Sequence, residues 1–177
     1  FIQNGNRHSY ITDIFSQLGE NDRDNYFVDK MFVFNDLIGK EYSKYIKGDI
    51  TTIGSLNNNS IKRSQKKGKG ILFISEWSML RTTNEIYGYY HPEKFIFPLL
   101  SKFAYENKME LNVLGRTFKS LPRDDGSKEK SFFSKLSENK NWNYIPILKP
   151  GKESYKIIDE SEIVVSISST LGYEAFG

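Results

Sequence analysis

Short apolar runs alternate with amphipathic segments along this chain, most regularly in its second half. Fully buried strands of a parallel sheet appear as near-continuous apolar runs, whereas surface helices repeat apolar residues at intervals of three and four. The apolar runs predict buried strands at 70–75, 110–114, 143–148 and 163–167. The amphipathic segments predict helices at 91–107, 127–136 and 154–161. Strands separated by helices favour a parallel sheet with right-handed crossovers, so we expect a Rossmann-like α/β half-domain.

The first part of the chain shows a shorter α/β pattern. The expected elements are a strand end at 1–3, a helix at 8–18, a polar loop at 19–25, a strand at 30–35, a helix at 36–46 and a strand at 49–53. Asp36 is the expected cap of the helix that it begins. Residues 57–70, NNNSIKRSQKKGKG, are polar and charged, which is typical of a linker. We therefore divide the chain into the end of one α/β domain (1–60), a linker (61–70) and a truncated second domain (71–177).

Composition narrows the class of protein. Of 177 residues, 38% are hydrophobic and 27% are charged, which describes a soluble globular chain, and no apolar run approaches the roughly 18 residues of a membrane span. The net charge of +3 is too small for a typical nucleic-acid-binding domain. Cysteine is absent, which excludes disulfides and thiolate zinc sites and fits the reducing cytoplasm. Since Phe1 is not an initiator methionine, we expect a piece of a longer protein.

Small and polar residues follow the predicted strands directly. In a parallel sheet the ligand crevice lies at the carboxyl ends of the strands. The residues expected there are Ser75, Glu76, Gly115, Arg116, Lys149, Pro150, Gly151, Ser168, Ser169 and Thr170. Hydroxyls, backbone N–H groups and the forked guanidinium of an arginine suit a phosphorylated ligand. The motifs of P-loop ATPases, dinucleotide enzymes, α/β-hydrolases and zinc proteases do not occur, and we expect neither a metal site nor a cofactor.

The last predicted strand leads into Ser168, Ser169 and Thr170, and Glu174 follows four residues after Thr170. Two interpretations of this stretch stay open. In the first, Thr170 caps a final helix, and the Glu174 carboxylate on the same face accepts hydrogen bonds from the diol of a ribose or sugar. In the second, the stretch is an ordinary strand-to-helix turn.

Three segments carry a resemblance to a known family: SYKIIDESEIVVSISSTLGYEAFG, GDITTIGSLNNN and FIQNGNR. They resemble the bacterial proteins of surface-carbohydrate (O-antigen or capsule) biosynthesis, whose fold is similar to that of GT-B glycosyltransferases. The run SSTLGYEA is also similar in layout to the nucleotide-binding loop of UDP-N-acetylglucosamine 2-epimerase. That resemblance implies that Ser168 and the following amides hold a diphosphate and that Glu174 holds a ribose. Ser169 and Thr170 stand where that loop has two glycines.

The resemblance implies a glycosyltransferase that uses a nucleotide sugar as donor and a glycan or lipid-linked glycan as acceptor. Residues 1–60 would then end the acceptor-side domain, and residues 71–177 would bind the nucleotide sugar. Two alternatives stay open. One is a sugar-nucleotide epimerase or hydrolase of the same fold, and the other is a non-catalytic nucleotide-binding scaffold of a polysaccharide assembly complex. Fold alone does not distinguish them.

Few residues are candidates for the catalytic base. His8 follows a predicted strand end, although a solvent-exposed loop histidine is the plainer interpretation, and Glu76 is the second candidate. His91 precedes Pro92 and is expected to start a helix rather than act as a base. The basic run between Lys62 and Lys69 is interpreted as a solvated linker, with a peripheral contact to the inner membrane as its alternative. The oligomeric state stays open.

Overall fold

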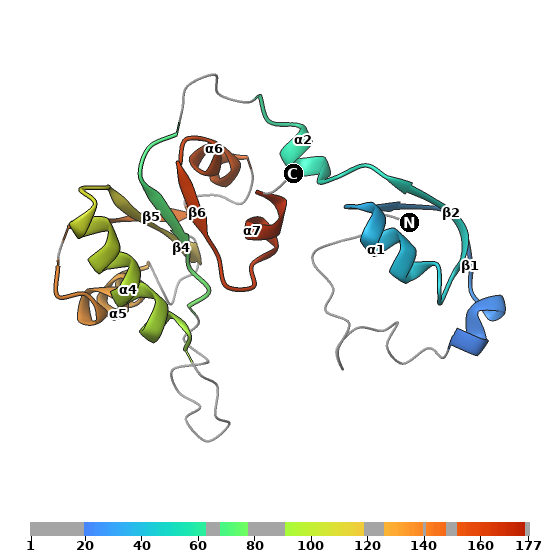
Figure 1. Ribbon diagram of the computed structural model, residues 1–177, viewed down its shortest axis with the longest axis horizontal. Helices are drawn as coiled ribbons and strands as arrows, with labels where there is room; N and C mark the ends of the chain where they lie inside the picture. Colours follow the sequence, from blue (N-terminus) through green and yellow to red (C-terminus); the bar gives the residue numbers. More distant parts are fainter. Residues whose placement is uncertain are drawn as a thin grey trace. The chain divides into compact units, whose positions relative to one another are not determined.

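The computed structural model describes residues 20–62, 68–77, 91–118, 126–139, 141–147 and 152–175. They form an α/β protein with two sheets, each of them parallel. The chain divides into two compact units, here called the first unit (Phe1–Ser60, with Gly177) and the second unit (Ile61–Phe176). Figure 1 shows the elements of both. The predicted segments 1–3 and 8–18, with His8, lie outside the described residues.

The first unit contains a two-stranded parallel sheet. Its elements are the 3-10 helix η2 (Glu20–Asn25), β1 (Phe27–Val33), α1 (Asp36–Tyr42), β2 (Lys47–Thr52) and α2 (Leu56–Asn59). The alternating residues Met31 and Val33 of β1 are buried against Tyr42 and Ile46, which form a small apolar core. Gly39 lets α1 lie close to this sheet, because a Cβ there would be 3.1 Å from the Ile50 side chain.

Local details of the first unit differ from the sequence-based expectations. The cap of α1 is Asn35, not Asp36: the side-chain Oδ1 of Asn35 accepts a hydrogen bond from the Ile38 N–H at 2.9 Å. The Asp36 carboxylate accepts from the Thr52 hydroxyl instead, which ties α1 to β2. The expected polar loop at 19–25 holds a 3-10 helix. The polar stretch 57–70 begins inside α2, which is capped by Ser55, and the expected linker 61–70 follows that helix.

The second unit contains a four-stranded parallel sheet. Its elements are β3 (Ile71–Ile74), α4 (Glu93–Glu106), β4 (Leu111–Phe118), α5 (Ser127–Leu136), β5 (Trp142–Ile147), α6 (Glu153–Asp159), β6 (Ile163–Val165) and α7 (Thr170–Glu174). The strand order is β5-β4-β3-β6. Numbered along the chain, this is the order 3-2-1-4 with which the Rossmann order 3-2-1-4-5-6 begins. The parallel α/β architecture expected from the alternation of elements is confirmed.

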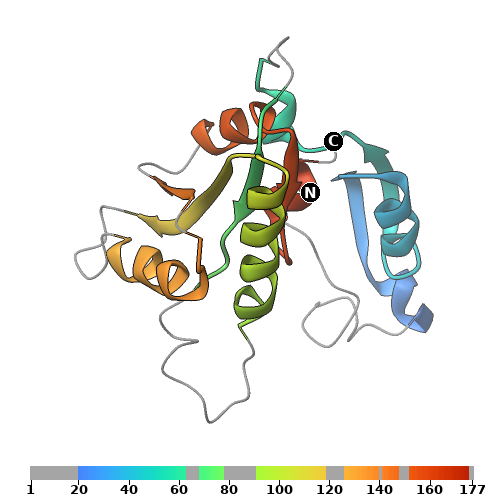
Figure 2. The ribbon, with the colours of Figure 1, turned by 60° about the vertical axis from the view of Figure 1, so that its left-hand side comes forward.

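Helices cover both faces of this sheet. On one face Phe73, Val113 and neighbouring residues pack against Phe97 of α4 and Phe133 of α5. On the other face Leu72, Ile74 and Leu114 pack against α6 and α7. Figure 1 shows α4 and α5 on one side of the strands and α6 and α7 on the other, and in Figure 2 the yellow-green helix α4 lies in front of the strands. Every residue of β3 is buried because the strand is covered from both sides.

Most boundaries in the second unit agree with the expected ones to within two or three residues. Helix α5 covers the predicted range 127–136, whereas β4 extends to Phe118 and β6 ends at Val165. Pro92 stands one position before α4 rather than at its first residue. The cap position of α7 is Ser169, not Thr170, and Ser169 makes no side-chain capping hydrogen bond.

The last two residues of the expected linker, Lys69 and Gly70, are hydrogen-bonded to the segment between α6 and β6. The Lys69 N–H donates to the Glu160 carbonyl at 3.0 Å, and the Gly70 carbonyl accepts from Ile163 at 3.1 Å. Gly70 has φ of +69°, and a Cβ there would lie 2.6 Å from the Glu110 carbonyl oxygen. Glycine is therefore required where the chain turns into β3.

Candidate functional site

A pocket of about 390 Å³ lies at the carboxyl ends of β3, β4 and β6. We call it the strand-end pocket, and it is lined by Ile74, Ser75, Glu76, Leu114, Gly115, Arg116, Ser168, Ser169, Thr170 and Leu171. The direction of strand order reverses between β3 and β6, since β4 and β5 extend from β3 on its other side. Parallel sheets bind their ligands at such a reversal.

The structure brings most of the predicted site residues together. All of the predicted residues after β3, β4 and β6 line the strand-end pocket, including Arg116 and the segment Ser168–Thr170. Glu174 does not line it: the Glu174 carboxylate lies one helix turn further on and accepts a hydrogen bond from the Tyr155 hydroxyl of α6. The predicted residues after β5, namely 149–151, lie outside the described residues, as does His8.

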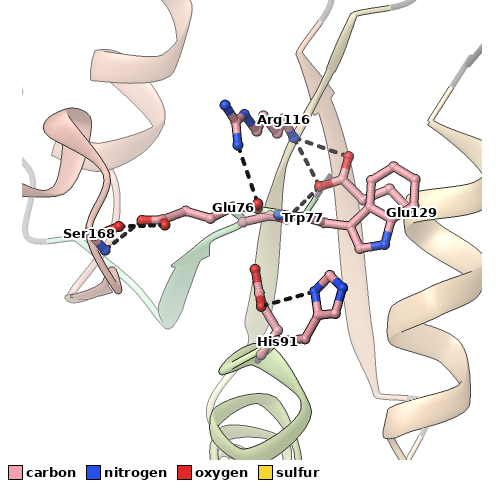
Figure 3. Close-up of polar contacts among 8 residues, drawn as sticks. Glu76, Trp77, His91, Arg116, Glu129 and Ser168 are labelled. Carbon is pink, nitrogen blue, oxygen red and sulfur yellow. Dashed lines mark hydrogen bonds and ion pairs between the residues drawn. The ribbon is translucent and has the colours of Figure 1, made fainter. Parts of the chain in front are cut away.

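Glu76 and Ser168 connect the loops after β3 and β6 (Figure 3). One carboxylate oxygen of Glu76 accepts the Ser168 N–H at 2.5 Å, and the other accepts the Ser168 hydroxyl at 2.7 Å. The Glu76 residue is 7% exposed, so this pair of hydrogen bonds is largely shielded from water. The two Ser168 groups that the sequence suggests as phosphate ligands therefore already hold a carboxylate.

Glu129, a residue of α5 that sequence reasoning overlooked, holds residues of the pocket wall in place through hydrogen bonds. Its carboxylate is fully buried and accepts from the Ser75 hydroxyl at 2.5 Å, the Arg116 N–H at 3.0 Å and the Tyr144 hydroxyl at 2.7 Å. Ser75 directly follows β3, Arg116 belongs to β4 and Tyr144 belongs to β5. One carboxylate thus fixes three neighbouring strands where they border the pocket (Figure 3).

The helix pattern contained a signal for Glu129. At helical spacing, residue 129 lies on the same face as Phe132, Phe133 and Leu136, which pack on the sheet. An ionisable side chain on the apolar face of an amphipathic helix is rarely buried without partners. The acid at 129 therefore indicated a buried polar network, although the pattern could not name its donors.

Gly115 and Arg116 of β4 shape the remaining wall. A Cβ at Gly115 would collide with the ring and hydroxyl of Tyr144, so glycine is needed for Tyr144 to reach Glu129. The Arg116 side chain is exposed, and its Nη1 donates to the Glu76 backbone oxygen at 3.4 Å. Since the Arg116 N–H is held by Glu129, the backbone is anchored while the guanidinium borders the pocket.

A second buried polar pair lies beside the start of α4, outside the strand-end pocket. His91 Nδ1 is 3.7 Å from Glu93 Oε2, and the two side chains are 5% and 0% exposed. The His91 ring packs against Phe132, with ring centroids 5.4 Å apart. His91 therefore stands at the start of a helix, as expected, and its side chain is part of the packed interior.

In the part of the chain that the structure describes, no cluster of three or more histidine, aspartate or glutamate side chains could hold a metal ion. No helix in the described ranges has both the length and the apolar character that crossing a bilayer requires.

Comparison with known proteins identifies a family. A family model described as "putative O-antigen biosynthesis protein" matches residues 1–177. Neither the curated proteins nor the solved structures give a significant match to this chain. The chain belongs to this family of O-antigen biosynthesis proteins.

Proposed function

We propose that the second unit binds a nucleotide sugar in the strand-end pocket, as the donor site of a glycosyltransferase of surface-polysaccharide biosynthesis. The observation that supports this most is the gathering of Arg116 and the hydroxyls of Ser168, Ser169 and Thr170 at the reversal of strand order. A volume of about 390 Å³ falls in the range of small-molecule sites. Membership of an O-antigen biosynthesis family fits this substrate class.

In the proposed complex, the diphosphate lies between the Arg116 guanidinium and the hydroxyl-bearing segment 168–170. A guanidinium binds phosphate oxygens through two parallel hydrogen bonds. Because α7 has only five residues, the proposal depends on these side chains and not on a helix dipole. An acceptor hydroxyl from a glycan or lipid-linked glycan would attack the anomeric carbon, and the nucleoside diphosphate would leave.

The assignment of the two units follows from the same proposal. Residues 1–60 would belong to the acceptor-side domain and residues 71–177 to the donor domain of a GT-B-like enzyme acting in the cytoplasm. His8 is the proposed base, since the Glu76 carboxylate is engaged with Ser168. Among the described lining residues of the pocket, Glu76 is the only acid, which favours transfer over epimerisation, a reaction that needs several carboxylates.

A panel of nucleotide sugars tests the proposal. We expect the donor to stabilise the folded chain by RT ln(1 + [L]/Kd), which raises its melting temperature. We also expect an isotope-labelled donor to transfer its sugar to a glycan acceptor. Binding without transfer or hydrolysis would support the scaffold alternative. Absence of any shift at millimolar concentrations of UDP-, CDP-, GDP- and TDP-sugars would refute the donor site.

Replacing Arg116 by glutamine should weaken binding of a nucleotide sugar by about 1.5–3 kcal/mol, the usual value of a hydrogen bond to a charged group. The side chain is exposed, so stability should change by only about 0.5 kcal/mol. Calorimetric titration and thermal melting of the same sample separate the two effects. Lys102→Gln, which removes one exposed positive charge on α4, is the matched control. Equal affinities of Arg116→Gln and Lys102→Gln would exclude Arg116 from the site.

A further inference from the structure

The contact between Glu76 and Ser168 has the form of an anion-binding site that is already filled. A backbone N–H and a hydroxyl of one residue each donate to a different oxygen of the same carboxylate, at 2.5 and 2.7 Å. Backbone amides and serine hydroxyls bind phosphate oxygens in the same way. The acid comes from a loop 92 positions away in the chain, so the contact is tertiary and not a local turn.

The backbone on both sides of Glu76 is held firmly. The Ser75 N–H donates to the Leu114 carbonyl at 3.0 Å, and the Ser75 hydroxyl donates to Glu129. The Trp77 N–H donates to the Ser75 hydroxyl at 3.1 Å, and the Trp77 side chain is 4% exposed in the core. Separation of the Glu76 carboxylate from Ser168 therefore requires rotation about the Glu76 side-chain bonds or movement of the segment that carries Ser168.

We propose that Glu76 is a specificity-determining residue, whose carboxylate occupies the Ser168 donors and disfavours ligand groups that place a double negative charge there. This inference rests on the proposed function. A phosphate that approaches Ser168 must either displace this carboxylate or lie beside its charge, and like charges at close range oppose binding. The penalty grows with the charge of the incoming group.

The consequence is a preference between substrate and product. In a nucleotide sugar each phosphate has one ester bond and shares the anhydride bond, so each carries a single charge, whereas the terminal phosphate of a nucleoside diphosphate is close to doubly charged at neutral pH. The Glu76 carboxylate therefore weakens binding of the nucleoside diphosphate product more than binding of the nucleotide-sugar substrate. A transferase gains from this, since product release limits turnover in many enzymes.

The test compares Glu76→Gln with the unchanged full chain. UDP-N-acetylglucosamine, UDP and pyrophosphate are titrated by calorimetry, pyrophosphate being included because it carries no base. We expect Glu76→Gln to raise the affinity for UDP and pyrophosphate by about tenfold, equal to about 1.4 kcal/mol. The gain for UDP-N-acetylglucosamine should be about threefold, so that the ratio of the two affinities shifts toward UDP.

Three further variants define the origin of the gain. Glu106→Gln removes one exposed acid at the far end of α4 and should change none of the affinities. In the double variant Glu76→Gln, Ser168→Ala, most of the gain should disappear, because the hydroxyl that the glutamate had occupied is no longer present. Glu76→Ala removes the carboxylate without leaving an amide facing the Ser168 donors, and should reproduce the gain.

The outcomes are distinct. Unchanged or weaker binding of UDP and pyrophosphate by both Glu76 variants would overturn the proposal, and so would equal gains for UDP and UDP-N-acetylglucosamine. Loss of the folded state in both Glu76 variants would show that the carboxylate is structural, which also overturns it. Failure of all three probes, pyrophosphate included, to bind any variant would instead refute binding of a diphosphate group in the strand-end pocket.

Discussion

Replacing Glu129 by alanine is expected to lower the free energy of unfolding of the second unit by about 3–5 kcal/mol, because three neutral donors lose one buried charged acceptor. The substitution leaves the Ser75 hydroxyl, the Arg116 N–H and the Tyr144 hydroxyl without their common acceptor. Each buried donor that loses its partner costs about 1–3 kcal/mol. The Glu129→Ala substitution also removes the hydrogen bonds that hold the ends of β3, β4 and β5 together at the wall of the strand-end pocket.

Urea titration followed by tryptophan fluorescence measures this effect. Both tryptophans of the chain, Trp77 and Trp142, belong to the second unit, so the signal reports that unit. Glu129→Gln keeps one acceptor oxygen and should cost less than Glu129→Ala. Glu106→Ala, an exposed acid on α4, should cost about 0.5 kcal/mol or less. A loss below about 1 kcal/mol in Glu129→Ala would show that water replaces the carboxylate and that the network is dispensable.

Replacing Phe133 by alanine should have an effect of similar size, about 3–5 kcal/mol, through a different cause. Phe133 is fully buried and its ring meets those of Phe73, Phe97 and Trp142, with centroid distances of 5.9, 4.8 and 6.4 Å. These rings come from β3, α4 and β5, so the truncation opens a cavity where four elements meet. The lost free energy combines transfer of the ring with the cost of that cavity.

The same urea titration tests this expectation, with Phe95→Ala as the matched control. Phe95 is a residue of α4 that is 64% exposed, and its truncation should change stability by about 0.5 kcal/mol. Phe133→Leu retains much of the volume and should fall between the two. Equal stabilities of Phe133→Ala and Phe95→Ala would mean that α5 is not packed on the sheet through this ring.

Regular periodicity made several elements predictable from the sequence. The apolar run ILFI is typical of a strand covered on both faces, and β3 is such a strand. The range of α5 followed from the apolar spacing of its residues. Alternation of strands and helices then implied a parallel sheet, and with it the location of candidate residues at the strand ends. These properties depend on residues close together in the chain, which a sequence displays directly.

The tertiary structure alone decided which of these residues contact one another. Asn35 and Asp36 are both good helix caps, and the choice depended on Thr52, which engages Asp36 from β2. Glu174 had a spacing suited to a ribose, yet Tyr155 of α6 holds its carboxylate outside the strand-end pocket. Glu76 and Ser168 are 92 positions apart, and Glu129 reaches donors 54, 13 and 15 positions away. Periodicity in the sequence indicates which face of a helix or strand is apolar. The hydrogen-bond partners of a buried carboxylate depend instead on which donors the packing of the strands brings within about 3 Å.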